Sequence, residues 1–183
     1  MNEPDDMILI QSYISGDERA FEMLYRRHRK QLYGYLCNLL SGNSAEVDEI
    51  FEMTWIKVID NLPAYRHQGK FSAWLFRVAK NVFLDTLRKN KNMPLPLDSE
   101  DVPEIPDWSR RPERDMEEKE SLQIIEEALA ELPRDQREVF LLRQQSFSFK
   151  EISEIQSCSI NTVLGRMHYA IRNLKKLITG KVN

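Results

Sequence analysis

Basic side chains gather in two stretches of this 183-residue sequence, and their chemistry suits contact with phosphate groups. Residues 66–91 carry seven lysines and arginines against one acid, and residues 139–183 carry seven against two acids. Lysine and arginine neutralise nucleic-acid phosphates locally, so each stretch can act as a binding surface. The formal net charge of −3 therefore does not exclude a nucleic-acid partner, because acidic segments elsewhere in the chain account for it.

The residue pattern does not indicate catalysis, metal binding or a membrane-spanning segment. No set of acid, base and nucleophile converges in the sequence, so we expect neither an enzyme nor a cofactor. Cys37 and Cys158 lie far apart, and His28, His67 and His168 stand in unrelated places, so no metal site is expected. No stretch approaches the roughly 20 apolar residues of a membrane span, and the acidic start lacks a secretion signal. We expect a cytoplasmic protein with reduced thiols.

The apolar spacing predicts an all-α fold of two small helical domains joined by a flexible, Pro-rich acidic linker. The first domain covers residues 1–91 and the second covers residues 117–183. The linker, residues 92–116, contains five prolines and seven acids against three bases.

Local signals predict where the helices of the first domain begin and end. Asp5 or Asp6 can cap a short helix that Gly16 breaks, and Asp17 opens a long second helix. A third helix is expected from about Ser44 until Pro63 stops it, and a fourth follows Gly69.

The second domain shows the pattern of a helix-turn-helix. Ser148 and Glu151 have the spacing of a capping box at the start of a short helix. About three residues later, Ser159 can cap a long final helix. An ordinary helical hairpin is the alternative explanation of this pattern.

The outward face of the fourth helix combines cations with an amide. Arg77, Lys80 and Arg88 fall opposite its apolar stripe, where they could track phosphates. Asn81 lies at the edge of that face, and its amide can both donate to and accept from a base edge. A solvated charged face is the alternative.

The final helix has a similar outward row, formed by Asn161, Gly165, His168, Arg172 and Lys176. Arg166 flanks this row and could hold a phosphate. Gly165 would let the helix approach a DNA groove closely, which gives a reason for a residue that costs about 1 kcal/mol inside a helix.

The third helix carries acids instead. Asp48, Glu49, Glu52 and Ile56 lie on the side away from its core stripe. Carboxylates around an exposed isoleucine suit a basic protein partner better than DNA.

Several segments together resemble the extracytoplasmic-function (ECF) group of bacterial RNA polymerase sigma factors. FSAWLFRVAKNVFLDTLRK, which runs from Phe71 to Lys89, looks like the promoter-reading helix of that group. VDEIFEMTWIKV is similar to its polymerase-clamp-binding helix, and LPRDQREVFLLR, EIS and SINTVLGRMHYAIRNL resemble its C-terminal helix-turn-helix domain. The match covers nearly the whole chain, with the two domains in the same order.

The resemblance implies a function and partners. Such a protein binds core RNA polymerase at the clamp coiled coil and recognises the −10 and −35 elements of promoter DNA. It has no catalytic residues of its own and is often held inactive by an anti-sigma factor.

The resemblance also implies roles for individual residues. Glu49 and Glu52 fall at the positions where the family makes its main polar contacts with polymerase. Asn81 falls at the position of the family's asparagine near the loop that reads the −10 element. Tyr65 and His67 lie in the loop before the fourth helix, where stacking on an unpaired base is credible. The −35 recognition helix contains Asn161, Thr162, Leu164, Gly165, Arg166 and His168.

Five positions depart from the family pattern. One of them is Glu52, which stands where glutamine is most often found. On the recognition helix, Leu164 stands where the family usually has lysine, and Gly165 stands where it usually has serine. In and before the turn, Ser157 replaces a common glycine and Gln156 replaces a common apolar residue. The helix-turn-helix should survive these changes, but its target sequence cannot be transferred from relatives. The alternative is a stand-alone helix-turn-helix regulator, which would have no need of the acidic face on the third helix.

Overall fold

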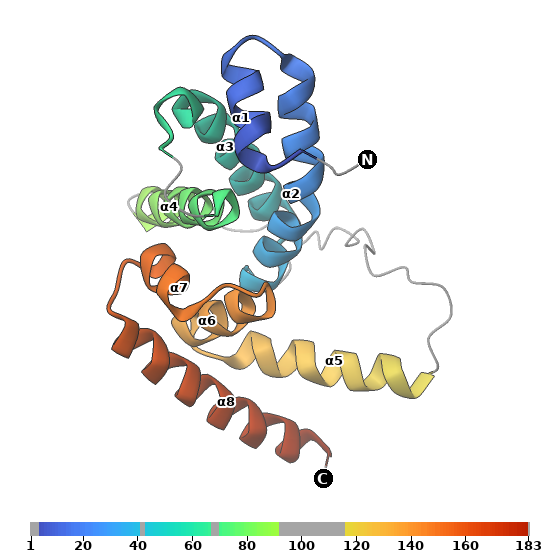
Figure 1. The fold of residues 1–183 in the computed structure, drawn as a ribbon. Helices are drawn as coiled ribbons and strands as arrows, with labels where there is room; N and C mark the ends of the chain where they lie inside the picture. The colour runs from blue at the N-terminus through green and yellow to red at the C-terminus, as the bar shows by residue number, and fades with distance from the viewer. Residues whose placement is uncertain (1–3, 41–42, 67–69, 92–115, 183) are drawn as a thin grey trace.

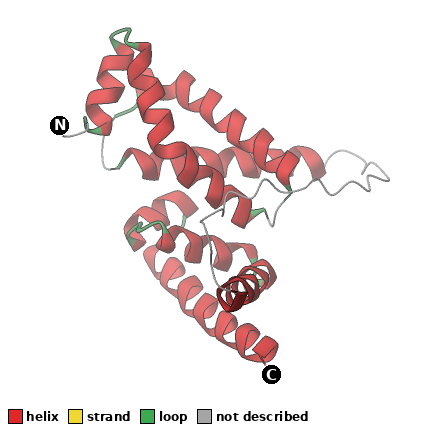
Figure 2. Cartoon of the chain, turned by 90° about the vertical axis from the view of Figure 1, so that its right-hand side faces the viewer, coloured by secondary structure: helices red, strands yellow, loops and turns green. Residues whose placement is uncertain are grey.

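The computed structural model describes residues 4–40, 43–66, 70–91 and 116–182, and every regular element within these ranges is a helix (Figures 1 and 2). The N-terminal helices are α1 (Asp6–Ile14), α2 (Glu18–Leu39), α3 (Ser44–Asn61), the short η1 (Leu62–Ala64) and α4 (Phe71–Lys91). The C-terminal helices are α5 (Met116–Glu131), α6 (Arg134–Gln144), α7 (Phe149–Gln156) and α8 (Ile160–Val182). This confirms the all-α prediction.

The expected local signals set the ends of the N-terminal helices. Asp5 and Asp17 cap α1 and α2 with their side chains, and Asn43 caps α3. Gly16 has a φ of 103°, a conformation that glycine adopts without a steric penalty, and it turns the chain between α1 and α2. Pro63 lies in η1, directly after α3, as the pattern predicted.

The N-terminal helices share one apolar core. Its fully buried members include Leu24 and Leu32 of α2, Ile50 and Val58 of α3, and Leu75 of α4. α1 packs on α2, and α3 packs on both α2 and α4. This packing fixes which faces of α3 and α4 remain outside.

The C-terminal helices form the predicted helix-turn-helix. Ser148 and Glu151 form a complete capping box at the start of α7, and the Ser159 hydroxyl accepts a hydrogen bond from the Thr162 amide at the start of α8. Between them, Ser157 ends α7 with a φ of 52° and a ψ of 46°. α8 packs on α5, α6 and α7, so one face of this long helix is buried and the other faces outward.

The two groups of helices also pack against each other. α4 lies on α7 and α2 contacts α5 and α6 (Figure 1). The Phe76 ring meets the Phe147 ring edge-on, with 5.0 Å between centroids, and both side chains are fully buried. The sequence did not predict this interface. The proposed linker, apart from Met116 at the start of α5, lies outside the described residues.

Candidate nucleic-acid and polymerase interfaces

The outer face of α3 carries the four residues expected to meet a basic partner. Asp48, Glu49, Glu52 and Ile56 are all exposed, and Ile56 is 59% exposed. The inward positions of α3, including Val47 and Thr54, are buried, so the opposite positions must point outward.

Two details of this acidic face were not predicted. Ile59 is also exposed one turn after Ile56, and so the apolar part of the face is larger than one residue. The Asp48 carboxylate accepts a hydrogen bond from the Tyr33 hydroxyl at 2.8 Å. Burial together with that carboxylate raises the pKa of Tyr33 to about 12, so the phenol remains a donor to Asp48 at neutral pH.

Part of the α4 face that is expected to bind DNA is exposed. Arg77, Asn81 and Arg88 are exposed. Arg88 shares an exposed ion pair with Asp85, at 3.2 Å, which water and a phosphate can replace at little cost. These three side chains are available to an external ligand in this structure.

Lys80, the fourth member of that set, points instead to the C-terminal helices. Its ammonium lies 2.6 Å from the Glu138 carboxylate of α6, and its side chain is only 11% exposed. In this arrangement Lys80 neutralises a protein carboxylate and is not presented to a phosphate. Its role at the −10 element stays a prediction.

Tyr65 belongs to an aromatic group beside the start of α4. Its ring lies 4.8 Å from Trp74 and 5.8 Å from Phe71, between centroids. Burial, with a contribution from the nearby Asp6 carboxylate, raises its pKa. His67, the other residue expected to stack on a base, lies outside the described residues.

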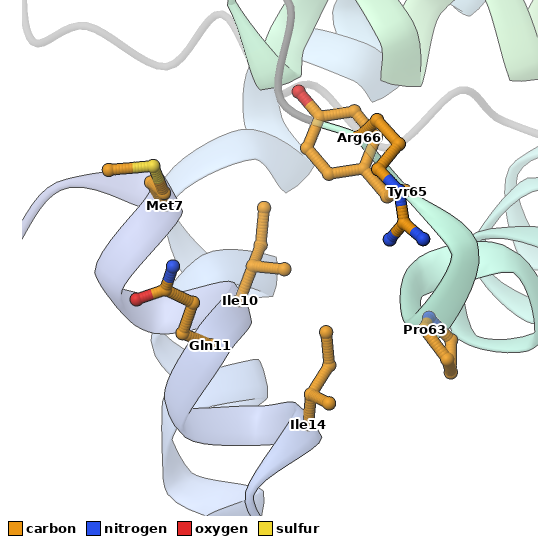
Figure 3. A pocket seen from close by; sticks show the side chains of 7 residues that line it. All are labelled: Met7, Ile10, Gln11, Ile14, Pro63, Tyr65 and Arg66. Carbon is orange, nitrogen blue, oxygen red and sulfur yellow. The ribbon is translucent and has the colours of Figure 1, made fainter.

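A small cavity opens next to Tyr65 (Figure 3). It has a volume of about 220 Å³ and lies between α1 and the segment that follows α3. Met7, Ile10 and Ile14 of α1 form one wall, and Tyr65 and Arg66 face them. The lining is mostly apolar, and its polar members are Gln11, Tyr65 and Arg66.

The outer face of α8 carries most of the expected −35 residues. The exposed members are Asn161, Thr162, Leu164, His168, Arg172 and Lys176. Arg172 also lies over the ring of Tyr169, with 4.8 Å from its guanidinium carbon to the ring centroid, a contact that orients the guanidinium. A Cβ added at Gly165 would meet nothing within 4 Å, so no neighbour in the described residues requires glycine there.

Arg166 turns away from that outer face. It is 26% exposed and pairs with the Asp135 carboxylate of α6 at 2.5 Å. It also donates to the side-chain oxygen of Gln156 at 2.8 Å. Both contacts lie within the C-terminal helices, which indicates that Arg166 holds α8 against α6 and α7.

Glu138 is an acid that sequence reasoning missed, and it joins the two groups of helices. Its side chain is 4% exposed and accepts three hydrogen bonds. The donors are the Lys80 ammonium at 2.6 Å, the Tyr35 hydroxyl at 3.1 Å and the Gln156 amide at 2.9 Å. Burial and the adjacent carboxylate raise the pKa of Tyr35 well above its usual value, so its hydroxyl stays protonated and donates.

Two family models match this chain. Sigma-70 region 2 matches residues 24–93 and sigma-70 region 4 matches residues 122–174. The ECF RNA polymerase sigma factor SigM of Mycobacterium tuberculosis (strain ATCC 25618 / H37Rv) is 29% identical over 179 residues, which cover 97% of this chain and 86% of that protein. The ECF RNA polymerase sigma-E factor of Haemophilus influenzae is 26% identical in an alignment of 186 positions, which covers 97% of this chain and 95% of that protein. The chain belongs to the ECF group of sigma factors.

Solved structures agree with this assignment of the fold. CnrH in complex with the cytosolic domain of CnrY has a TM-score of 0.69 and 25% identity, over 96% of this chain and 97% of that chain. The sigma factor RpoE in complex with the anti-sigma factor NepR from Bartonella quintana has a TM-score of 0.66 and 21% identity, over 87% and 96% of the two chains. This ECF sigma factor is therefore a transcription initiation factor and not an enzyme.

Gln156 explains one departure of this sigma factor from the usual pattern. The position is buried, and in this chain its amide connects the Glu138 carboxylate of α6 to the Arg166 guanidinium of α8. An apolar side chain would leave both groups short of a partner. The signal in the sequence was a glutamine at an inward position of an amphipathic helix, but nothing local indicated its partners.

The described residues contain no helix long and apolar enough to cross a membrane. Within the same residues, no group of three or more potential metal-binding side chains comes together. Cys37 and Cys158 are both half-buried free thiols.

Proposed function

We propose that this sigma factor binds core RNA polymerase through the acidic outer face of α3, and promoter DNA through α4 and α8. The observation that carries the proposal is the sorting of exposed side chains by helix. Carboxylates and isoleucines lie outward on α3, whereas cations and amides lie outward on α4 and α8. Complementary charge favours encounter with a basic protein surface in the first case and with phosphates in the second.

The individual roles come from the family resemblance, and this sorting of exposed side chains supports them. Asp48, Glu49, Glu52 and Ile56 form the polymerase-binding face, which fits the clamp coiled coil. Residues 1–91 form the domain that recognises and melts the −10 element, with Tyr65, His67, Arg77, Lys80, Asn81 and Arg88 in contact with DNA. Residues 117–183 form the −35 domain, and residues 92–116 connect the two.

The −35 element is read by the outer face of α8. Asn161, Thr162, Leu164, Gly165 and His168 lie towards the helix start, where a recognition helix meets base edges. Arg172 and Lys176 follow about one and two turns after His168, towards the phosphates. Arg166 does not face DNA in this proposal. It holds α8 in place by pairing with Asp135 and donating a hydrogen bond to Gln156.

An anti-sigma factor is the regulatory partner we propose. The sigma factor RpoE from Bartonella quintana, whose fold this chain shares, was solved in complex with the anti-sigma factor NepR. The site of action is the cytoplasm, where core polymerase and promoter DNA are found.

Reconstitution with bacterial core polymerase tests the proposal. We expect the full chain to direct transcription from a subset of promoters in a genomic DNA library, and core enzyme alone to give none. Promoters selected in this way would then define both elements. Specific duplex binding with no effect on core enzyme would contradict the proposal and favour a stand-alone regulator.

A further inference from the structure

The start of α8 presents an apolar pair to solvent, on a helix that lies along the outside of the C-terminal group (Figure 1). Ile160 and Leu164 are each 44% exposed, although α8 has a separate buried stripe that includes Val163 and Ala170. The pair lies one turn apart on one flank of the helix, about 6 Å along its axis. It therefore forms a continuous apolar surface at the end of α8 that meets base edges in the proposed function.

No cation accompanies this apolar pair on the outer face. Within residues 160–167, about the first two turns of α8, the only charged side chain is Arg166. Its guanidinium is 26% exposed and pairs with Asp135 of α6, so it is turned inward. Arginine and lysine are the side chains that bind the acceptors of guanine in the major groove. The start of α8 thus lacks the usual means of reading guanine.

An apolar side chain in the major groove has one complementary group among the base edges, the C5-methyl of thymine. The other groups there are hydrogen-bond donors and acceptors, which would lose water against a leucine and gain no partner. Leu164 is the fifth residue of α8, in the part of a recognition helix that contacts base edges. The 6 Å between it and Ile160 corresponds to roughly two base-pair steps of 3.4 Å.

Gly165 allows the close approach that such a contact needs. Apolar groups are in contact only when their heavy atoms come within about 4–4.5 Å, so the helix backbone must lie near the bases. Glycine destabilises a helix interior relative to alanine, yet a Cβ added at Gly165 would meet nothing within 4 Å. No described neighbour accounts for this glycine, whereas a DNA groove next to Leu164 does.

From these observations we propose that Leu164, with Ile160 beside it, reads thymine in the −35 element through the C5-methyl group. Asn161 and Arg172 flank the pair and supply hydrogen bonds and charge to the same duplex. The proposal rests on the proposed function, since it assumes that α8 enters the major groove of the −35 element.

Selection with the holoenzyme identifies the thymines concerned. Full-length protein assembled with core polymerase selects duplexes from a promoter library that is randomised across the −35 element. We expect at least one position of that element to be fixed as a thymine–adenine pair. A selected element with no preferred thymine–adenine pair would overturn the proposal.

Deoxyuridine then tests the methyl contact itself. It lacks the C5-methyl group of thymine and keeps every hydrogen-bonding group. At the thymine read by Leu164, this replacement should raise the Kd of the holoenzyme for the duplex about three- to five-fold, the effect of one buried methyl group. Deoxyuridine in the spacer between the two elements should leave the Kd unchanged. Equal Kd values for every substituted −35 element would overturn the proposal.

Leu164→Ala should abolish this sensitivity, so that L164A binds the thymine and deoxyuridine duplexes equally. The matched control is Ile171→Ala, since Ile171 is 41% exposed on α8 but lies two turns further from the helix start. I171A should keep the three- to five-fold ratio. Because the readout is a ratio of two Kd values, general losses of stability or of core binding cancel. An L164A protein that kept the wild-type ratio, or that only bound core polymerase less well, would overturn the proposal and place Leu164 elsewhere.

Two further variants test the chemistry and the approach. Leu164→Lys should change the selected base from thymine to guanine, and an unchanged selection would overturn the proposal. Gly165→Ala should raise the Tm of the free protein, because alanine favours the helix, and yet raise the Kd for the thymine duplex several-fold. A merely structural role for this position would move both measurements in the same direction.

The outcomes separate this proposal from the proposed function. If the holoenzyme directs transcription from selected promoters but its Kd does not depend on thymine methyl groups, only the reading of thymine is wrong. If the wild-type protein gives no promoter-directed transcription with core polymerase, both are wrong.

Discussion

The Lys80 ammonium lies 2.6 Å from the Glu138 carboxylate, although the two residues are 58 positions apart and belong to different groups of helices. Each residue comes from a segment with its own resemblance to a sigma-factor domain. Their contact gives α4 a second buried face, which includes Phe76 and Phe83, in addition to the face that packs on α3. Arg134 of α6 extends this interface, because its guanidinium lies over the Phe83 ring at 5.3 Å.

The first prediction separates two cations that bind DNA, Arg172 and Lys176, from a structural arginine, Arg166. Replacing Arg172 and Lys176 with alanine should weaken promoter binding by the holoenzyme. It should also reduce the slope of log K against log salt by about 0.9 for each lost phosphate contact. The measurement is filter or anisotropy binding to a −35-containing promoter over a range of salt concentrations.

Arg166→Ala should behave differently. It removes the partner of Asp135 and Gln156, so we expect the free energy of unfolding to fall by about 1–2 kcal/mol. The salt slope should hardly change. Lys30→Ala, on the exposed surface of α2, is the control for loss of one charge. If R166A reduced the salt slope of promoter binding as much as R172A does, Arg166 would be a DNA contact instead.

A second prediction concerns the outer face of α3. Charge reversal of Glu49 and Glu52 to lysine should raise the Kd for core polymerase at least ten-fold. Placing like charges together at a complementary interface costs several kcal/mol. Titration of labelled sigma factor with core enzyme measures this effect. Glu126→Lys, the same reversal on α5, is the control, and an unchanged Kd for the α3 variant would reject this face as the polymerase site.

Most helix boundaries could be predicted because their causes are local. The side chain of Asp17, the capping box of Ser148 and Glu151, and the ring of Pro63 act within about four residues of their own positions. The outward faces of α3 and α8 could also be predicted, because each helix has one continuous apolar stripe and the remaining positions must face outward.

The interface between the two groups of helices could not be predicted in the same way. An amphipathic pattern reveals one buried face, and Phe76 and Lys80 lie outside the stripe expected for α4. Whether Lys80 meets a phosphate or a carboxylate depends on a segment that begins more than 50 residues later. The same limit applies to Gln156 and Arg166, whose partners come from three different helices.

A third prediction concerns the attachment of α1. The Asp6 carboxylate pairs with Arg27 at 2.6 Å and with His28 at 2.9 Å, and so ties α1 to α2. Burial alone would raise the pKa of Asp6, but hydrogen bonds and charge from His28 and Arg27 outweigh it and lower the pKa. A lowered pKa in the folded state means that the stabilisation is complete above the ordinary value of 3.8 and is lost as the pH falls through the lower folded value.

Asp6→Asn should therefore cost about 1–2 kcal/mol of unfolding free energy at pH 7, and its difference from wild type should shrink below about pH 4. Urea denaturation at several pH values measures both effects. Asp60→Asn, at an exposed position of α3, should change stability little at any of these pH values. A difference for D6N that stayed constant down to pH 2 would show that the ion pairs are not its source.

The fourth prediction concerns the turn of the helix-turn-helix. Ser157 has a φ of 52°, in the left-handed region where a side chain costs roughly 1–2 kcal/mol and glycine does not pay that steric penalty. Ser157→Gly should therefore stabilise the protein by about 1 kcal/mol, less the entropy that glycine adds to the unfolded chain. Ser153→Gly, the same substitution four residues earlier inside α7, should destabilise it by about 0.5–1 kcal/mol, because that position is helical. Denaturant unfolding of the full-length protein compares the two variants, and changes of the same sign would show that backbone conformation at Ser157 does not determine the effect.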